Sequence, residues 1–269
     1  MANINKYHLV TVKPNIDTKG NVAFDADDIL FDWTAFEVPR GGCAIRSLNI
    51  IMPGTDGTSA NGALQMDLYF ATSLNGVAPP SLGLTNAVPT VVATTACRNH
   101  IIALNSVLGS EMEDSLDGLI GYNVLGKGAV TSATTMQSEQ LTVLEGDTSF
   151  VGARGGVRAT PTGFQTIWVA AIAQGAYDFG TGVLVDGAKG TVTREFDVSE
   201  DTDAEDVFCI GDEVIAFASD GTSGQIIGTV TGVTADTITT DGVGFDGALA
   251  DDDEFSFRQP IKIKIGLEY

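Results

Sequence analysis

Few side chains in this sequence could support nucleophilic or acid–base catalysis. The chain has only two histidines, His8 and His100, and a Ser-His or Cys-His catalytic pair would have to use one of them. Cys97 precedes His100 by three residues, but the sequence contains no Gly-x-Ser-x-Gly nucleophile segment. His8 lies in an apolar, strand-like segment. We therefore predict structural roles for both imidazoles and no catalytic residue.

A segment at residues 121–127 has the glycine and lysine spacing of a phosphate-binding loop. It reads Gly-Tyr-Asn-Val-Leu-Gly-Lys. Position 128 is glycine, whereas a phosphate-binding loop has Ser or Thr there to bind Mg²⁺, and no helix pattern follows. We therefore expect a glycine-rich loop here, and we predict neither a nucleotide site nor any other cofactor.

Carboxylates gather in three short clusters, and hard cations such as Ca²⁺ bind several oxygen ligands. The clusters are Asp25/Asp27/Asp28, residues 200–206 and residues 251–254. None has the glycine-containing loop and ordered ligand positions of a Ca²⁺ site, so we favour solvated loops, predict no metal ligands and leave Ca²⁺ binding open.

A carboxylate pair for glycoside hydrolysis also stays open, although aromatic residues, which usually line sugar sites, are only 7% of the chain. Trp33 and Trp168 lie in apolar alternation and are expected in the core.

The net charge of −21 is distributed unevenly along the chain. Residues 181–259 hold 18 acidic and 3 basic side chains, a net of −15, which leaves −6 for the remainder. So negative a surface repels phosphate backbones and anionic lipids, and we expect neither a nucleic acid nor a membrane as partner.

The three cysteines, Cys43, Cys97 and Cys209, cannot all pair, and none lies in a C-x-x-C spacing. Reduced, structural thiols are the expected state. The first residues lack the charged and then apolar pattern of a secretory leader, and residues 159–177 are too polar to span a membrane. These features predict a protein that is made and kept in a reducing cytoplasm.

The residues on either side of the acidic block predict strands that pack into a sandwich. Residues 261–269 alternate apolar and polar positions, as a strand with one buried side does. Residues 166–173 are apolar on both faces, as expected for a central strand that is buried on two sides. Residues 44–52 and 63–72 are expected to pair as a hairpin. The acidic first turn at residues 110–119 predicts a short helix. Further strands are expected at residues 7–13, 36–38, 99–108 and 141–144.

From residue 181 the sequence changes to short strands separated by hairpin-type turns. Five strands are expected, at residues 183–185, 190–193, 213–217, 225–233 and 237–240. They predict a small barrel or meander. The fold class is therefore all-β: a β-sandwich, jelly-roll-like, formed by residues 1–180 and completed by a strand at 260–269, with a small acidic β-domain inserted at residues 181–259.

A long, uncharged connection at residues 73–95 is the candidate interaction site. Such connections are uncommon in compact domains and often make contacts. Its apolar residues would form an exposed patch on a monomer, and such patches mark interfaces. They are Leu74, Val77, Leu82, Leu84 and Val88. With the loop at residues 53–62, this connection predicts a homo-oligomer, with a trimer as the leading expectation.

Two stretches of the chain resemble virion structural proteins of tailed bacteriophages, notably those of marine hosts. Residues 36–51 and 64–70 are similar to the first half of these proteins, and residues 211–217, 227–233, 236–240 and 260–267 to the second half. The likeness covers most of the chain and lies in its hydrophobic and turn pattern.

The resemblance implies a non-enzymatic protein, assembled into the virion in the host cytoplasm. It points to a decoration or cement protein that binds the major capsid protein or other virion proteins and stabilises the capsid exterior. The alternative is a tail or fibre adhesion protein that binds a host-surface glycan.

Overall fold

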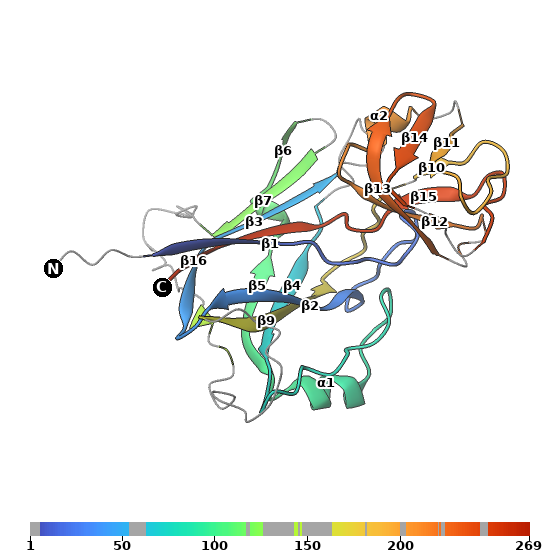
Figure 1. The fold of residues 1–269 in the computed structure, drawn as a ribbon. Coiled ribbons are helices and arrows are strands. Elements are labelled where there is room, and N and C mark those ends of the chain that lie inside the picture. The colour runs from blue at the N-terminus through green and yellow to red at the C-terminus, as the bar shows by residue number, and fades with distance from the viewer. Residues whose placement is uncertain are drawn as a thin grey trace.

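The computed structural model describes residues 6–53, 63–116, 119–125, 143–144, 146, 163–180, 182–199, 203–219, 221, 224–242 and 247–269. Within these ranges the chain is built mainly from antiparallel strands in three sheets, which confirms the all-β prediction (Figure 1). Two short helices, α1 (Val91–Cys97) and α2 (Ala204–Val207), and a 3₁₀ turn at Gly109–Glu111 interrupt them. No helix in the described ranges is long and apolar enough to cross a membrane.

The first sheet has the strand order β1-β16-β3-β7-β6, with β8 paired to β3. Its strands are β1 (Tyr7–Val12), β16 (Lys262–Glu268), β3 (Cys43–Pro53), β7 (Leu119–Leu125), β6 (Met112–Leu116) and β8 (Val143–Leu144). β16 therefore lies between β1 and β3, and the two ends of the chain lie side by side (Figure 1). The predicted last strand is confirmed: Ile263, Ile265 and Leu267 are fully buried, whereas Lys262 and Lys264 are half-buried on the other side.

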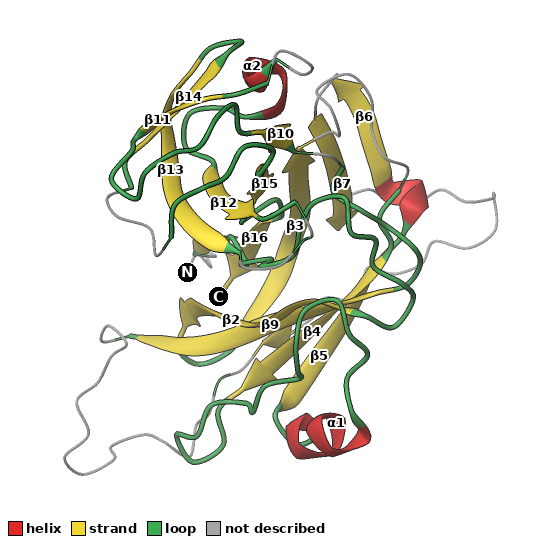
Figure 2. Ribbon diagram, turned by 90° about the vertical axis from the view of Figure 1, so that its right-hand side faces the viewer, coloured by secondary structure: helices red, strands yellow, loops and turns green. Residues whose placement is uncertain are grey.

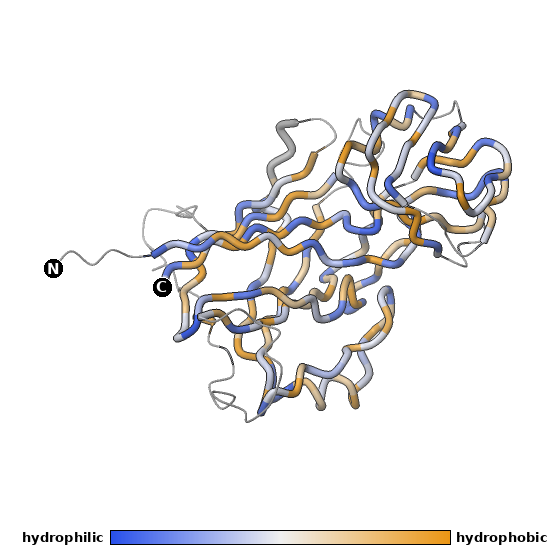
Figure 3. Tube along the Cα trace, in the orientation of Figure 1, coloured by the Kyte–Doolittle hydropathy of each residue, from blue (hydrophilic) through white to orange (hydrophobic). Residues whose placement is uncertain are grey.

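The second sheet has the order β2-β9-β4-β5 and faces the first (Figure 2). Its strands are β2 (Ile29–Pro39), β9 (Phe164–Ala173), β4 (Met66–Thr72) and β5 (Ile101–Val107). The predicted central strand is β9, which pairs with β2 on one side and β4 on the other. Apolar side chains from both sheets form one buried cluster, including Phe31, Leu48, Phe70, Val169 and Ile265. The strands thus form the predicted sandwich. Hydrophobic and hydrophilic residues alternate along many of these strands (Figure 3).

The third sheet lies wholly between residues 183 and 257 and has the order β10-β15-β12-β13-β14-β11. Its strands are β10 (Val183–Leu184), β15 (Glu254–Phe257), β12 (Glu213–Phe217), β13 (Gln225–Val233), β14 (Thr237–Thr240) and β11 (Glu195–Asp197). An isolated bridge between Val185 and Val198 joins the two edges of this sheet, so that it curls into a small barrel. We call this part the inserted unit.

The inserted unit has a hydrophobic cluster of its own, which includes Phe196, Phe208, Val214, Ile238 and Phe255. The buried residues of the sandwich cluster come instead from residues 12–179 and 261–267. The division into a sandwich of residues 1–180 with 260–269 and an inserted unit of residues 181–259 stays a prediction about independent folding.

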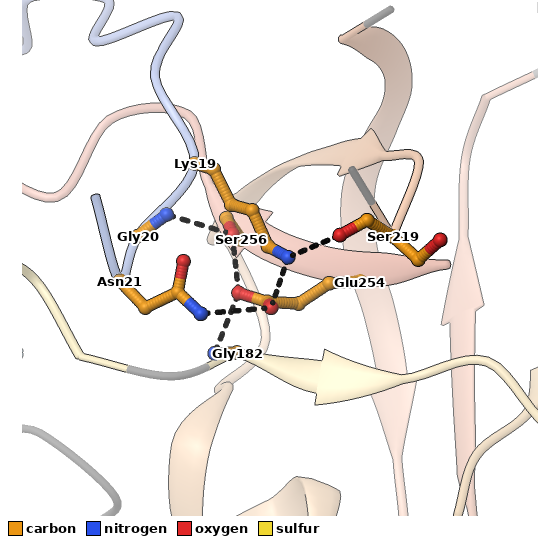
Figure 4. Close-up of polar contacts among 7 residues, drawn as sticks. All are labelled: Lys19, Gly20, Asn21, Gly182, Ser219, Glu254 and Ser256. Atoms are coloured by element: carbon orange, nitrogen blue, oxygen red, sulfur yellow. Dashed lines mark hydrogen bonds and ion pairs between the residues drawn. The ribbon is translucent and has the colours of Figure 1, made fainter. Parts of the chain in front are cut away.

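A buried ion pair joins the inserted unit to the sandwich (Figure 4). Glu254 lies 3.0 Å from Lys19 Nζ, and these side chains are 2% and 11% exposed. The Glu254 carboxylate also accepts hydrogen bonds from the backbone N–H of Gly182 at 3.0 Å and from Ser256 Oγ at 3.3 Å. Ser256 Oγ in turn accepts the N–H of Gly20 at 3.1 Å. The carboxylate is thus both paired and hydrogen-bonded, as a buried charge must be.

The predicted hairpin of residues 44–52 and 63–72 is wrong. β3 pairs with β16, β7 and β8 in the first sheet, whereas β4 pairs with β9 and β5 in the second. Both strands bury alternate side chains in the same core from opposite sheets, so their alternation indicates a buried face and not a partner.

Two local predictions are also wrong. The expected helix at residues 110–119 is a single 3₁₀ turn followed by β6. The Glu111 carboxylate accepts the Leu108 N–H at 2.9 Å and so caps this one turn, and the residues after it pair with β7 as a strand. The expected strand at residues 190–193 is a turn, with the Thr193 N–H bonded to the Gly190 carbonyl at 3.0 Å, and β11 begins two residues later.

Candidate interaction surface

Residues 73–100 form a covering segment over the outer face of the second sheet, on the side away from the sandwich core (Figure 2). The segment includes α1, which was not expected within the long connection. Thr90 begins the helix, and its Oγ1 accepts the Ala93 N–H at 3.2 Å. A small cluster of Ile29, Leu82, Cys97 and Ala170, with Trp33 and Ile172 beside it, packs the segment onto the sheet.

Hydrogen bonds fix the covering segment to strand β2. Trp33 Nε1 donates to the Pro80 carbonyl at 2.9 Å, and Asp32 Oδ1 accepts the Leu82 N–H at 3.0 Å. The Ile29 backbone pairs with Ala87 and Asn86 at 3.1 and 2.9 Å. These hydrogen bonds restrain the segment, and such restraint lowers the entropy cost of a contact made through it.

The covering segment carries an apolar surface, which we define as Leu74, Val77, Leu84, Val88, Val91 and Val92. All six are exposed, and Leu84, Val91 and Val92 are 80–81% exposed. No charged residue occurs between Asp67 and Arg98. Exposed apolar side chains that gather on one uncharged stretch of chain are candidates for an interaction surface.

The predicted interface residues divide into exposed and buried positions. Leu74, Val77, Leu84 and Val88 are on the apolar surface, whereas Leu82 is only 5% exposed and anchors the segment instead. Leu74 and Val77 flank a two-residue turn, Asn75-Gly76, with φ of 51° and 79°, a hairpin geometry that Asn-Gly favours. The loop at residues 53–62 lies almost wholly outside the described residues. Sequence reasoning did not single out Val91 and Val92, although the uncharged run that includes them was visible.

A cavity of about 310 Å³ lies between the covering segment and the second sheet. Its lining residues are Asp27, Trp33, Tyr69, Leu82, Pro89, Thr94, Cys97, Ile101 and Ile172. Trp33 and Trp168 were expected in the core, but both are half-buried. Trp33 lies on the outer side of its sheet and lines the cavity, which alternation along a strand could not reveal.

The two histidines make different contacts in different parts of the sandwich. The His8 ring lies 5.3 Å from the Phe164 ring, and His100 is buried with Nδ1 2.9 Å from the Thr72 carbonyl. Cys97 Sγ donates to the Pro80 carbonyl at 2.8 Å. The structure therefore does not bring Cys97 and a histidine ring together as a hydrogen-bonded catalytic pair.

The glycine-rich loop expected at residues 121–127 is wrong for its first five residues, which belong to β7. Positions 126–127 lie outside the described residues. A strand with its N–H groups paired to β3 cannot offer them to a phosphate.

Three carboxylates of the acidic clusters accept backbone hydrogen bonds. Asp28 Oδ2 accepts the Asp25 N–H, Asp251 Oδ1 accepts the Gly187 N–H and Asp253 Oδ2 accepts the Ala250 N–H, each at 2.8 Å. Residues 200–202 of the second cluster lie outside the described residues. In the part of the chain that the structure describes, no three His, Cys, Asp or Glu side chains group so as to hold a metal ion.

Comparison with known proteins does not identify a relative. No family model matches the sequence, and no curated protein matches it significantly.

Proposed function

We propose that this protein is a non-enzymatic structural component of a tailed-bacteriophage virion, and that it binds the capsid exterior as a decoration or cement protein. The observation that carries the proposal is the apolar surface on the covering segment, which is hydrogen-bonded to β2 and has no charged residue before Arg98. Burying apolar side chains favours association, and residues 73–97 of the segment carry no charge that would have to be desolvated. The proposed partner is the major capsid protein or a neighbouring virion protein.

The distribution of charge supports this orientation. The inserted unit holds most of the negative charge and lies on the opposite side of the molecule from α1 (Figures 1 and 2). With the covering segment on the capsid, the inserted unit faces solvent. Its like charge then keeps neighbouring particles apart.

The number and position of copies in the particle test this proposal. Quantitative mass spectrometry of purified virions and a cryo-EM map should find the protein on the capsid at on the order of hundreds of copies, as the repeated sites of a symmetric shell allow. A few copies at the tail tip would reject the cement role.

We also propose a homo-oligomer, with a trimer as the leading expectation, because the exposed apolar residues of the covering segment would also suit contacts between copies of the chain. Light scattering should give a mass near three times 28.0 kDa. A monodisperse monomer that also fails to bind empty capsids would reject both proposals.

Adhesion to a host-surface glycan is the second candidate. The cavity under the covering segment combines aromatic side chains, Trp33 and Tyr69, with the carboxylate of Asp27, and such groups orient ligands in binding sites. Binding to a glycan array that is lost in a Trp33→Leu variant would favour adhesion over the cement role.

A further inference from the structure

We propose that the cavity under the covering segment takes a lysine or arginine side chain of the bound partner, with its aliphatic stem against the apolar walls and its cationic group at Asp27. The identification of that partner as a virion protein rests on the proposed function. The chemistry of the cavity does not.

The walls suit a long aliphatic stem. Leu82, Ile101 and Ile172 line the cavity, and Trp33 is oriented by its hydrogen bond to Pro80. Lysine and arginine bury their methylene groups along apolar surface while the charged end stays in contact with water. A volume of about 310 Å³ lies at the lower end of the range for ligand sites.

The charge at the cavity favours a cation. Asp27 is the one ionisable carboxylate among the nine lining residues, and none of the nine is basic. Burial, and then the nearby carboxylates of Asp67 and Asp27, raise the pKa of the Tyr69 hydroxyl. Both carboxylates therefore act on the space beside Tyr69, and the rings of Trp33 and Tyr69 can also attract a cation.

The position of Asp27 is fixed by an uncommon backbone conformation. Its φ is 73°, a left-handed value that Asp and Asn adopt more readily than most residues. Its N–H donates to the Ala173 carbonyl at 2.8 Å. Backbone in sparsely populated regions is often found at binding sites. Since Asn tolerates the same conformation, Asp27→Asn removes the charge and keeps the geometry.

An NMR titration of the whole chain tests the proposal without a virion. The probe is Nα-acetyl-lysine methylamide, compared with its norleucine analogue, which has the same stem without the ammonium group. The chain has two tryptophans, and a Trp33→Phe variant assigns the Trp33 indole resonance. We expect saturable shifts of that resonance, with the lysine probe binding about threefold to tenfold more tightly than norleucine, as a partly exposed ion pair with a cation–π contact predicts.

Two variants separate the cavity from general electrostatic attraction. Asp27→Asn should abolish the preference for lysine. Asp25→Asn removes the same charge two residues away, at a residue that does not line the cavity, and should keep the preference. The proposal is overturned if the Trp33 resonance does not respond, if norleucine binds as tightly as lysine, or if the two variants behave alike. Lysine binding in a protein that fails to bind capsids would reject the cement role and leave the cavity assignment intact.

Discussion

The covering segment and the inserted unit are both additions to the same sandwich, and their chemistry is opposite. The segment runs from residue 73 to residue 100 and its first charged residue is Arg98, whereas residues 181–259 carry 18 acidic and 3 basic side chains. The segment leaves large apolar side chains exposed. The inserted unit instead uses carboxylates such as Asp251 and Asp253 to hold its turns. The apolar surface of the covering segment can be desolvated at little cost, whereas the acidic surface of the inserted unit cannot. The two sides of the molecule therefore suit different surroundings.

The two additions also differ in what holds them. The covering segment has only a small cluster against the second sheet and depends on hydrogen bonds to β2. The inserted unit has its own buried cluster and meets the sandwich through the Lys19–Glu254 and Arg258–Asp17 pairs, among other contacts. The covering segment thus needs the sandwich beneath it to keep its conformation. The inserted unit needs the sandwich mainly for the contacts at their junction.

Substitutions in β16 test how much both additions depend on the sandwich core. Ile263→Asp should abolish folding, because the side chain is fully buried in the core and an unpaired charge there is very costly. Lys262→Glu, one residue away on the half-buried side, should be mild. Circular dichroism and solubility measure both. Equal damage from the two changes would show that β16 cannot tolerate a change on either face.

Removing the buried cation tests the junction of the inserted unit. Lys19→Met leaves the Glu254 carboxylate buried without its ion pair and should lower the free energy of unfolding by about 3–5 kcal/mol. The control is Lys189→Met, which removes a cation from Asp197, whose side chain is 62% exposed, and should cost less than about 1 kcal/mol. Urea denaturation compares them. Similar losses in the two variants would contradict a structural role for the buried pair.

Replacing residues 181–259 by a short Gly/Ser linker tests the independence of the two clusters. We expect a soluble sandwich that still melts cooperatively, because an insertion costs its host little when its ends lie close together. Thermal melting monitored by circular dichroism is the measurement. Aggregation of the shortened chain would mean that the sandwich needs the inserted unit to fold.

Thiol labelling compares the sandwich and its covering segment with the inserted unit without substituting any residue. Burial raises the pKa of Cys43 to about 11 and also raises that of Cys97. At pH 8 only about one Cys43 in a thousand would be the reactive thiolate. Partial burial and the Asp212 carboxylate also raise the pKa of Cys209, in the inserted unit. Cys209 is nevertheless the exposed one of the three thiols, and we expect iodoacetamide to label it first because the reagent can reach it. Mass spectrometry that found Cys43 or Cys97 labelled as fast as Cys209 would contradict this burial.

The raised pKa of Cys43 also predicts a pH dependence of stability. The folded state favours the neutral thiol, so this contribution is complete below the unfolded pKa of about 9 and is lost as the pH rises towards about 11. The loss amounts to about 2–3 kcal/mol. Urea denaturation from pH 8 to 11 should show a smaller decline in Cys43→Ala than in the parent protein.

The sequence predicted which strand faces are buried and where turns occur. It predicted poorly which strands pair with one another. The alternation of residues 261–269 located β16, and turn residues placed β12, β13 and β14 at their observed bounds. Alternation could not tell that β3 and β4 belong to different sheets, since both bury one face in the same core. Of the candidate site, the uncharged run was visible in the sequence. The cavity was not, because Trp33, Tyr69 and Ile172 converge only when β2, β4 and β9 lie side by side.

If the proposed virion role is right, binding to empty capsids of the phage that encodes the protein tests the central claim most directly. The double variant Leu84→Asp/Val88→Asp places charge on the apolar surface, and Val192→Asp does so at a position of the inserted unit that is equally exposed, at 80% against 81% for Leu84. Each variant should unfold within about 0.5 kcal/mol of the parent protein, as surface changes do. We predict that the parent and Val192→Asp cosediment with capsids and that the double variant does not. Cosedimentation of the double variant at the parent level would contradict the assignment of this surface to the capsid.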